Sequence, residues 1–303
     1  MMVSSNERTK TFEPIFKTEL GELYCADALE FMDYLAQKDI KFQLIFADPP
    51  YNIGKAEWDK FQSQDEYLEW TVKWVNKAGR LLKNDGSLLI MGIPEILAEV
   101  LYVIKRKCPW IKYCRWLVWH YRNKPNPSKK GWVRSHEGIL HIAKSTDFKF
   151  YQDRIREPYN AHTLKYPLRS QAQTSLFGKS GYVWEPNKLG AKPRDVLIIP
   201  AVNNPSRENV NHPTQKPEEL LRKFVLALTD EGDLVYDPFG GSGTTYVVCE
   251  QLRRRWIGTE INPEYCQMAI NRLKSLPKKP PEYWIELDLK RELHRMKVRG
   301  RLF

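Results

Sequence analysis

Several features that would place a protein in a membrane or outside the cell are missing from this sequence. No apolar run approaches the roughly 20 residues that are needed to span a bilayer. The first 17 residues are polar and lack the apolar core of a secretory signal. We therefore expect a cytoplasmic protein that has no membrane partner.

The sequence also lacks the cysteine patterns of disulfide frameworks and zinc sites. Its five cysteines form no CxxC pair and show no repeating spacing, so we interpret them as reduced thiols. The nearest histidine pair, His136 and His141, has no cysteines at the spacing of a zinc site. We expect no metal centre.

Acidic residues are fewer than basic ones. The chain contains 48 Lys and Arg against 37 Asp and Glu, which gives a net charge of +11 over 303 residues. Such an excess favours a polyanionic partner, because Lys and Arg that neutralise phosphates release condensed counterions. The length suits one large α/β domain, or one such domain that carries a smaller insertion.

Segments typical of strands alternate with segments typical of helices, which indicates an α/β fold with a mostly parallel, twisted sheet. Apolar runs that end at turn residues predict the strands, and apolar spacing of three to four residues predicts the helices. The expected strands are 42–47, 87–91 (after a turn at 85–86), 116–121, 138–143, 233–239 and 256–261, and the expected helices are 67–81, 95–107, 217–229, 242–252 and 263–276.

The composition and the periodicity of the chain change between residues 145 and 211. This stretch is rich in Pro, Asn, Gln, Arg and Tyr and has poor periodicity, so we interpret it as an inserted module. The predicted organisation has a first half at 1–144, the insertion at 145–211, a second half at 212–276 and a basic C-terminal tail at 277–303.

A glycine-rich loop, Asp237-Pro-Phe-Gly-Gly-Ser-Gly-Thr-Thr245, lies between an expected strand and an expected helix. Glycines there let the backbone turn tightly and approach a ligand. Glu260 ends the next strand, where an acidic residue can accept hydrogen bonds from ribose hydroxyls. No Lys-Ser/Thr pair follows the last glycine, so a nucleoside without phosphates, such as S-adenosylmethionine, fits better than a nucleoside triphosphate. The alternative is a tight turn with a surface glutamate.

The tetrapeptide Asp48-Pro49-Pro50-Tyr51 follows the apolar strand 42–47, at the end where open α/β sheets bind ligands. The Asp48 carboxylate and a carbonyl of the proline pair can accept hydrogen bonds from the amino group of a base, whose lone pair then points at an incoming methyl group. Tyr51 offers a flat face on which a flipped base can stack. The alternative is a strand that ends at prolines beside a packed tyrosine.

With both motifs placed, the sequence resembles the beta-class DNA amino-methyltransferases, which share a Rossmann-like methyltransferase fold. The resemblance covers residues 20–276, and rests on the order of catalytic tetrapeptide, target-recognition region at 145–211, and glycine loop. It implies S-adenosylmethionine as the cofactor, with Thr214 and Lys216 at its carboxylate and Asp27 near its adenine. Ala26 stands where the family usually has glycine. The cofactor-binding residues that the resemblance implies are Asp27, Ala28, Asp48, Thr214, Lys216, Asp237, Phe239, Gly241, Gly243, Thr244 and Glu260.

The resemblance further implies double-stranded DNA as the substrate. Asp48 at the head of the tetrapeptide is more usual for adenine-N6 enzymes, and cytosine-N4 methylation is the alternative. An RNA base methyltransferase and an inactive DNA-binding subunit are two further alternatives, although RNA enzymes normally carry the glycine loop first. None of the cysteines follows a proline, so the covalent mechanism of cytosine-C5 enzymes lacks its nucleophile. The resemblance makes a homodimer and a separately acting cognate restriction endonuclease plausible.

Overall fold

The computed structural model describes residues 11–54, 59–123, 130–167, 169–170, 183–203, 206 and 208–299. The chain divides into two compact units, one formed by residues 1–150 and 195–279 and the other by residues 151–194 and 280–303. None of the helices in these described ranges is both long and apolar enough to cross a membrane.

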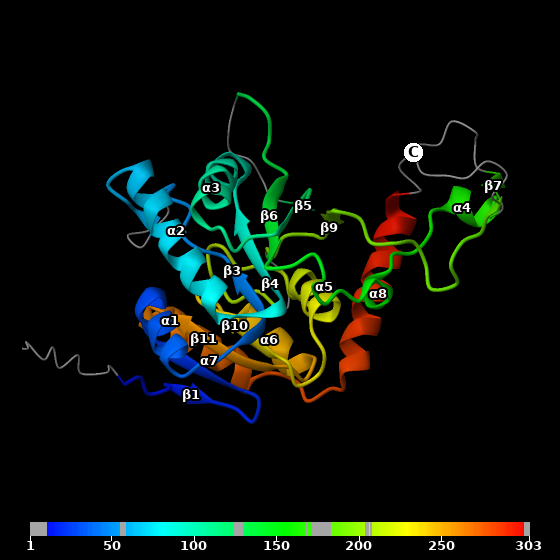
Figure 1. Cartoon of the computed structure of the whole chain (residues 1–303). Coiled ribbons are helices and arrows are strands. Elements are labelled where there is room, and N and C mark those ends of the chain that lie inside the picture. Colours follow the sequence, from blue (N-terminus) through cyan, green and yellow to red (C-terminus); the bar gives the residue numbers. More distant parts are fainter. Residues whose placement is uncertain are drawn as a thin grey trace, which may run out of the picture. The chain divides into compact units, whose positions relative to one another are not determined.

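The first unit contains a nine-stranded sheet with the order β1-β2-β11-β10-β3-β4-β6-β5-β9 (Figure 1). Strands β1 and β6 run against the other strands of this sheet, which are parallel to one another. The strands are β1 (Phe16–Lys17), β2 (Gly21–Cys25), β3 (Phe42–Ala47), β4 (Leu82–Gly92), β5 (Tyr113–His120), β6 (His136–Ala143), β9 (Val196–Ile198), β10 (Leu234–Asp237) and β11 (Arg255–Glu260).

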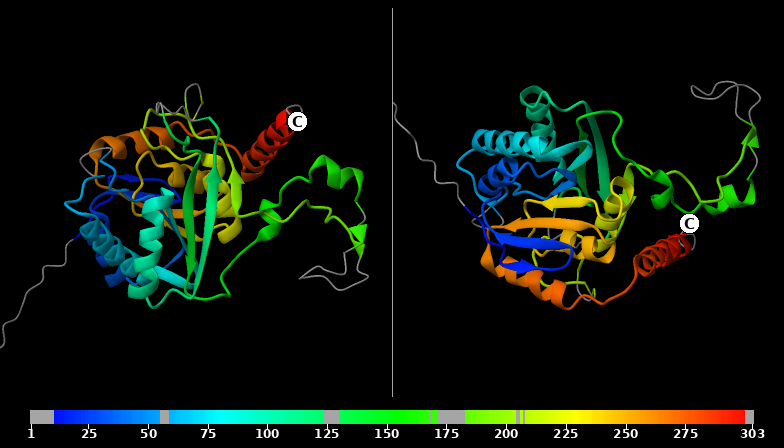
Figure 2. Two further views of the ribbon diagram at one scale, coloured as in Figure 1. Left: turned by 90° about the horizontal axis from the view of Figure 1, so that it is seen from above. Right: turned by 60° about the horizontal axis from the view of Figure 1, so that its bottom comes forward.

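Helices cover both faces of this sheet, as the alternation of side chains along β3 shows. Ile45 and Ala47 belong to a core that includes buried residues of the first three helices, whereas the ring of Phe46 points to the opposite face and stacks on Phe224 of α5. Figure 2 shows the helices around the sheet from two further directions. These helices are α1 (Ala28–Gln37), α2 (Gln64–Leu81), α3 (Pro94–Lys107), α5 (Glu218–Leu228), α6 (Thr244–Gln251) and α7 (Pro263–Lys274).

The expected elements of this unit are present, with bounds that shift by a few residues. One local prediction is wrong, because β4 runs unbroken through Asp85 and Gly86, where we expected a turn. The register between β3 and β4 shifts opposite this point, and the side-chain amide of Gln43 donates to the Asp85 carbonyl at 3.0 Å. The irregularity is therefore absorbed as a bulge within the sheet, and the chain does not reverse.

The second unit contains short elements from the middle of the chain and one long helix from its end. They are η2 (Gln152–Ile155), α4 (Ala161–Lys165), the strand pair β7 (Arg169–Ser170) and β8 (Val183–Trp184), and α8 (Pro281–Arg299). Residues 168, 171–182, 204–205 and 207 of the expected recognition region lie outside the described residues.

The sequence pattern grouped residues 195–211 with the insertion, whereas in the structure they belong to the first unit. Strand β9 hydrogen-bonds in parallel to β5 and so extends the main sheet. A strand of three residues carries too little alternation to be recognised in the sequence. The functional division of the chain at 145 and 211 stays a prediction.

Candidate active site

The two sequence motifs lie side by side, at the carboxyl ends of two neighbouring strands in the middle of the sheet. Strand β10 pairs directly with β3, with Val235 opposite Leu44 and Tyr236 opposite Ile45. From this pair the chain proceeds to β4 on one side and to β11 on the other, so the gap beyond the strand ends is the topological switch point of the sheet. Ligands of open α/β sheets bind at such a point.

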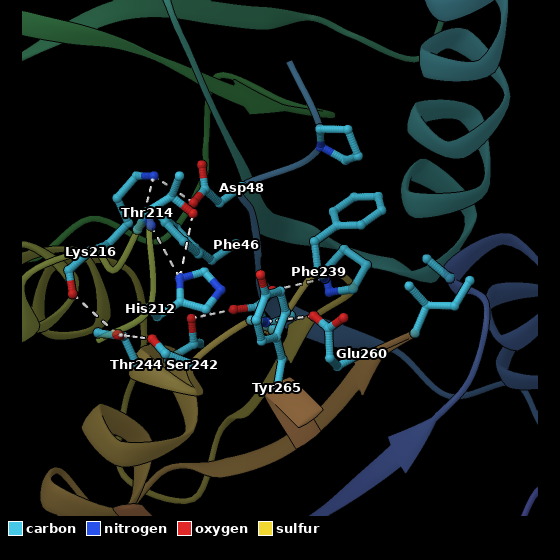
Figure 3. A pocket seen from close by; sticks show the side chains of 18 of the residues that line it. Phe46, Asp48, His212, Thr214, Lys216, Phe239, Ser242, Thr244, Glu260 and Tyr265 are labelled. Carbon is cyan, nitrogen blue, oxygen red and sulfur yellow. Dashed lines mark hydrogen bonds and ion pairs between the residues drawn. The ribbon is translucent and has the colours of Figure 1, made fainter. Parts of the chain in front are cut away.

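A pocket of about 260 Å³ opens there, close to the lower end of the usual size range for small-molecule sites (Figure 3). Most of the predicted site residues line it, whereas Pro49, Tyr51 and Gly243 do not. The lining residues are Ala26, Asp27, Ala28, Phe46, Asp48, Pro50, Phe61, Trp70, His212, Thr214, Gln215, Lys216, Asp237, Pro238, Phe239, Gly240, Gly241, Ser242, Thr244, Thr245, Glu260, Ile261 and Tyr265.

The glycine loop lines this pocket with backbone atoms that no side chain covers. Gly241 and Gly243 have φ values of 50° and 76°, in the left-handed region that favours glycine. A Cβ at Gly240 would lie 1.7 Å from the hydroxyl oxygen of Tyr246, so this position has room only for glycine. The loop can therefore approach a ligand more closely than side chains would allow.

Glu260 fixes the loop from the next strand. One carboxylate oxygen accepts from the Gly241 backbone amide at 2.7 Å and the other accepts from the Asn262 amide at 2.8 Å. Burial raises the pKa of Glu260, although these amides lower it in part. Each carboxylate oxygen has a second lone pair, so Glu260 can still accept bonds from a ligand hydroxyl.

Asp27 lies on the same side of the pocket. Glu260 pairs with Cys25 across the β2–β11 ladder, and the Ala26 amide donates to the Glu260 carbonyl at 3.0 Å. The Asp27 carboxylate caps α1 by accepting from the amides of Leu29 and Glu30. Capping alone explains an aspartate at this position, and its contact with a cofactor adenine stays a prediction.

An aromatic wall closes the pocket next to these acids. The rings of Trp70 and Phe239 have centroids 5.6 Å apart, and Phe61 packs on Trp70 at 5.3 Å. Trp70 lies within the helix predicted at 67–81, but neither Trp70 nor Phe61 was predicted as a site residue, because helical spacing identifies a buried face and not its neighbour. A flat apolar wall of this kind suits a purine ring.

Asp48 stands at the other end of the pocket, where two donors hold its carboxylate. The Tyr51 hydroxyl donates to Oδ1 at 2.5 Å. The Lys216 ammonium donates to Oδ2 at 2.6 Å (Figure 3). Burial lowers the Lys216 pKa, but the carboxylates of Asp48 and Glu137 outweigh burial, so that the pKa is raised overall. Lys216 is thus a buried cation at physiological pH.

The roles that the resemblance assigns to Thr214 and Lys216 stay predictions. In this structure the Lys216 ammonium contacts Asp48 as well as the Thr214 carbonyl at 3.2 Å. The Thr214 hydroxyl lies 3.5 Å from the imidazole of His212, whose ring packs edge-on against Tyr265. His212 and Tyr265 both line the pocket, and Tyr265 had no signal in the sequence because it is one of several polar residues on α7.

Asp59 holds the chain that follows the tetrapeptide, a role that the sequence analysis missed. The backbone amides of Tyr51, Asn52 and Ile53 converge on its carboxylate at 2.6, 2.7 and 3.2 Å. Asp59 is only 1% exposed, and Asn52 adopts a φ of 56° within this turn. The turn fixes the direction in which the Tyr51 ring leaves the backbone.

Glu137, on β6, is a second buried carboxylate that the sequence analysis missed. Its Oε2 atom lies 3.5 Å from the Tyr51 hydroxyl and 3.6 Å from the Lys216 ammonium, and its Oε1 accepts from the Tyr121 hydroxyl at 3.4 Å. Strand β6 is next to β4 in the sheet, and only the sheet order brings its first residues to the carboxyl end of β3.

Asp237 ends β10 beneath the glycine loop. The Thr245 hydroxyl donates to it at 2.5 Å and the Phe239 amide donates at 3.0 Å. Burial raises its pKa to about 7, against the lowering effect of these hydrogen bonds. Within the described ranges, no three His, Cys, Asp or Glu side chains gather as a metal site.

Comparisons with known proteins identify the family of the chain. The model of a DNA methylase family, named for N6 and N4 methylation, matches residues 42–271. The type II methyltransferase M1.MboII of Moraxella bovis is 31% identical over 256 residues, which are 83% of this chain and 95% of that protein. The DNA adenine methyltransferase YhdJ of Escherichia coli (strain K12) is 32% identical over 266 residues, which are 85% of this chain and 84% of that protein.

Solved structures agree on the fold. The cytosine-N4-specific PvuII DNA methyltransferase has a TM-score of 0.63 at 22% identity, covering 94% of this chain and 97% of its own. The M1.HpyAVI complex with S-adenosylmethionine has a TM-score of 0.56 at 24% identity, covering 84% of this chain and 99% of its own. The expected Rossmann-like methyltransferase fold is confirmed. This chain therefore belongs to the beta-class DNA amino-methyltransferases, S-adenosylmethionine-dependent enzymes that methylate adenine at N6 or cytosine at N4.

Proposed function

We propose that this chain methylates the N6 amino group of adenine at a specific site in double-stranded DNA. The observation that carries the proposal is the position of the Asp48 carboxylate, which lines the pocket of the glycine loop and is oriented by Tyr51 and Lys216. The pocket thus has an acceptor for an amino group at one end and an acidic, glycine-lined nucleoside site at the other.

S-adenosylmethionine would occupy the nucleoside end. Glu260 would accept the ribose hydroxyls, and the backbone of Gly241 would lie against the ligand. Asp27 and the wall of Phe239 and Trp70 would hold the adenine. When bound there, the cofactor supplies an electrophilic methyl group on a positively charged sulfur, and the acidic lining of the pocket suits a cation.

Asp48 would accept a hydrogen bond from the target amino group and stabilise the positive charge that develops on its nitrogen. A backbone carbonyl of Pro49 or Pro50 would accept the second hydrogen. Such preorganised acceptors contribute more in a dry site than in water, because they need not reorient as the charge forms. The contacts of Asp48 with Tyr51 and Lys216 would fix the direction of its lone pairs.

The choice of adenine rests on the aspartate at the head of the tetrapeptide and on relatives such as YhdJ, named as an adenine methyltransferase. Cytosine N4 is the second candidate, favoured by the similarity of the fold to the cytosine-N4-specific PvuII enzyme. The acceptor chemistry is the same for both amino groups, so the shape of the base pocket decides between them.

An amino group inside a base pair cannot reach a methyl donor at the end of a buried sheet, so the nucleotide would flip out of the duplex. Tyr51 would stack on the flipped base, which contributes about 1–3 kcal/mol per base. Residues 145–211 would read the target sequence through Arg, Lys, Asn and Gln side chains. Type II names among the relatives support a cognate restriction endonuclease as partner, and the family resemblance supports a homodimer.

Sequencing that detects N6-methyladenine and N4-methylcytosine, in DNA from cells expressing the chain, tests base and site together. We expect N6-methyladenine at one short motif, and none in cells that express Asp48→Ala at equal level. N4-methylcytosine at a short motif would show that the target base is cytosine and not adenine. Unmodified DNA together with methylated RNA would refute DNA as the substrate.

Flipping is tested separately with 2-aminopurine at the target position of the duplex. Its fluorescence should rise on binding, because the neighbouring bases that quench it are lost. Tyr51→Ala should reduce both the rise and the turnover, whereas Tyr51→Trp should retain much of both. Flat fluorescence with the active wild-type protein would argue against flipping.

A further inference from the structure

Two hydrogen-bond donors at the candidate active site are shared between two carboxylates. The Tyr51 hydroxyl lies 2.5 Å from Asp48 and 3.5 Å from Glu137, and the Lys216 ammonium lies 2.6 Å from Asp48 and 3.6 Å from Glu137. Both donors therefore contact Asp48 and are about 1 Å too far from the same oxygen of Glu137, Oε2, for a strong bond.

This arrangement conflicts with the task of Asp48. An ammonium at 2.6 Å neutralises the carboxylate and takes up one of its oxygens, which weakens Asp48 as an acceptor for an incoming amino group. Glu137 is 6% exposed and Lys216 is 7% exposed, so water screens this effect little. The site needs a second anion that can receive the ammonium when the target base arrives.

We propose that Glu137 is a positioning residue that withdraws Lys216 and the Tyr51 hydroxyl from Asp48 when the target amino group binds. A shift of both donors toward Glu137 frees an oxygen of Asp48 and restores its negative charge where the nitrogen becomes positive. The inference rests on the proposed role of Asp48 and holds for adenine and cytosine alike. It makes the buried triad of two carboxylates and one ammonium the functional unit.

The geometry of Glu137 supports this role over a purely structural one. Its other oxygen, Oε1, lies 3.4 Å from the hydroxyl of Tyr121, whose ring packs on Trp119 of β5, so Tyr121 does not occupy the oxygen that Tyr51 and Lys216 face. A short movement of either donor would bring it within hydrogen-bond distance of Oε2. Tyr121 thus offers a matched control, because it contacts Glu137 through Oε1, whereas Tyr51 and Lys216 face Oε2.

The test compares Glu137→Gln, Lys216→Met, the double variant and Tyr121→Phe. Single-turnover methyl transfer is measured at saturating S-adenosylmethionine on the duplex identified by sequencing, together with cofactor affinity and thermal unfolding. Glu137→Gln should lower the rate 10- to 100-fold while cofactor affinity stays within about threefold, because glutamine keeps the shape and loses the charge. Tyr121→Phe should change the rate less than about threefold.

The double variant decides the mechanism. If Glu137 acts by withdrawing the ammonium, removing Lys216 in the Glu137→Gln background should raise the rate at least tenfold over Glu137→Gln alone. The inference would be overturned if the rate losses of the two single variants multiplied in the double variant. It would also be overturned if the rate of Glu137→Gln lay within threefold of wild type. Asp48→Ala separates the two levels: if that variant keeps its turnover, the proposed catalytic site itself fails, whereas an inactive Asp48→Ala with an active Glu137→Gln refutes this inference alone.

Discussion

Replacing Asp237 by asparagine is expected to stabilise the fold at alkaline pH, although the residue lies in the candidate cofactor site. Asp237 is 3% exposed, and burial raises its pKa from the ordinary value of 3.8 to about 7. In the folded chain the ionised form is therefore disfavoured. Asparagine has nearly the same shape and can still accept the hydrogen bond from the Phe239 amide.

The sign and the pH window follow from linkage between protonation and folding. Below pH 3.8 both states carry a protonated Asp237, so its titration contributes nothing to the free energy of unfolding. Between pH 3.8 and about 7 the unfolded chain loses the proton while the folded chain keeps it, which favours unfolding. Three pKa units at about 1.4 kcal/mol each correspond to roughly 4 kcal/mol above pH 7, an upper bound because the buried site can relax.

Thermal unfolding of both proteins without cofactor, at pH 4 and at pH 8, measures this effect. Asp237→Asn should melt at the wild-type temperature at pH 4 and several degrees higher at pH 8. Asp233→Asn is the matched control. Burial alone would raise the pKa of Asp233, but the Asp230 amide and Lys149 outweigh it and lower that pKa, so this variant should lose stability, and more at pH 8 than at pH 4. A melting temperature of Asp237→Asn at pH 8 equal to or below that of wild type would refute the reasoning.

Other perturbations probe the same site. Gly241→Ala should lower the affinity for S-adenosylmethionine at least fivefold, as measured by calorimetry, because the φ of Gly241 is 50° and a Cβ would lie 3.2 Å from the His212 ring. Unchanged affinity would show that the loop is a tight turn without a role in cofactor binding. Asp59→Asn should lower turnover about tenfold with cofactor affinity intact, since three amides lose a charged acceptor, and equal turnover would exclude its role in orienting Tyr51. Cofactor affinity should rise between pH 6 and pH 8 with proton release, because a bound cation lowers the raised pKa of Asp237; affinity that is flat in this range would contradict that coupling.

The parts of the fold that could be predicted are those with strong local patterns. The strand 42–47 is apolar except for Gln43 and is followed by Asp48 and two prolines, and its observed bounds are Phe42–Ala47. The glycine loop needs left-handed backbone at two positions, which glycine signals directly. Strand β9, by contrast, has three residues and depends on pairing with β5, and no local pattern contains that information.

The same distinction separates the site residues. Asp48, Asp237 and Glu260 follow or end strands within recognisable motifs, so their positions could be expected. Glu137 and Asp59 act through three-dimensional proximity. Glu137 sits within an ordinary apolar strand, and Asp59 is identified only by the amides that turn back toward it, eight residues from Tyr51. Residues that orient a motif have no fixed spacing from it, because the fold, and not the helix or strand period, brings them together.

The two ends of the pocket differ in how their buried carboxylates are compensated. At the nucleoside end, burial raises the pKa values of Asp237 and Glu260, and the backbone amides and the hydroxyl that face them offset burial only in part. At the catalytic end, Lys216 lies between Asp48 and Glu137 and compensates their burial. A bound cation would therefore gain most at the nucleoside end, where the carboxylates hold no other positive partner among the contacts of the described residues. The ammonium at the catalytic end keeps Asp48 oriented until a target amino group competes for it, so the two ends are prepared for their ligands by opposite electrostatic means.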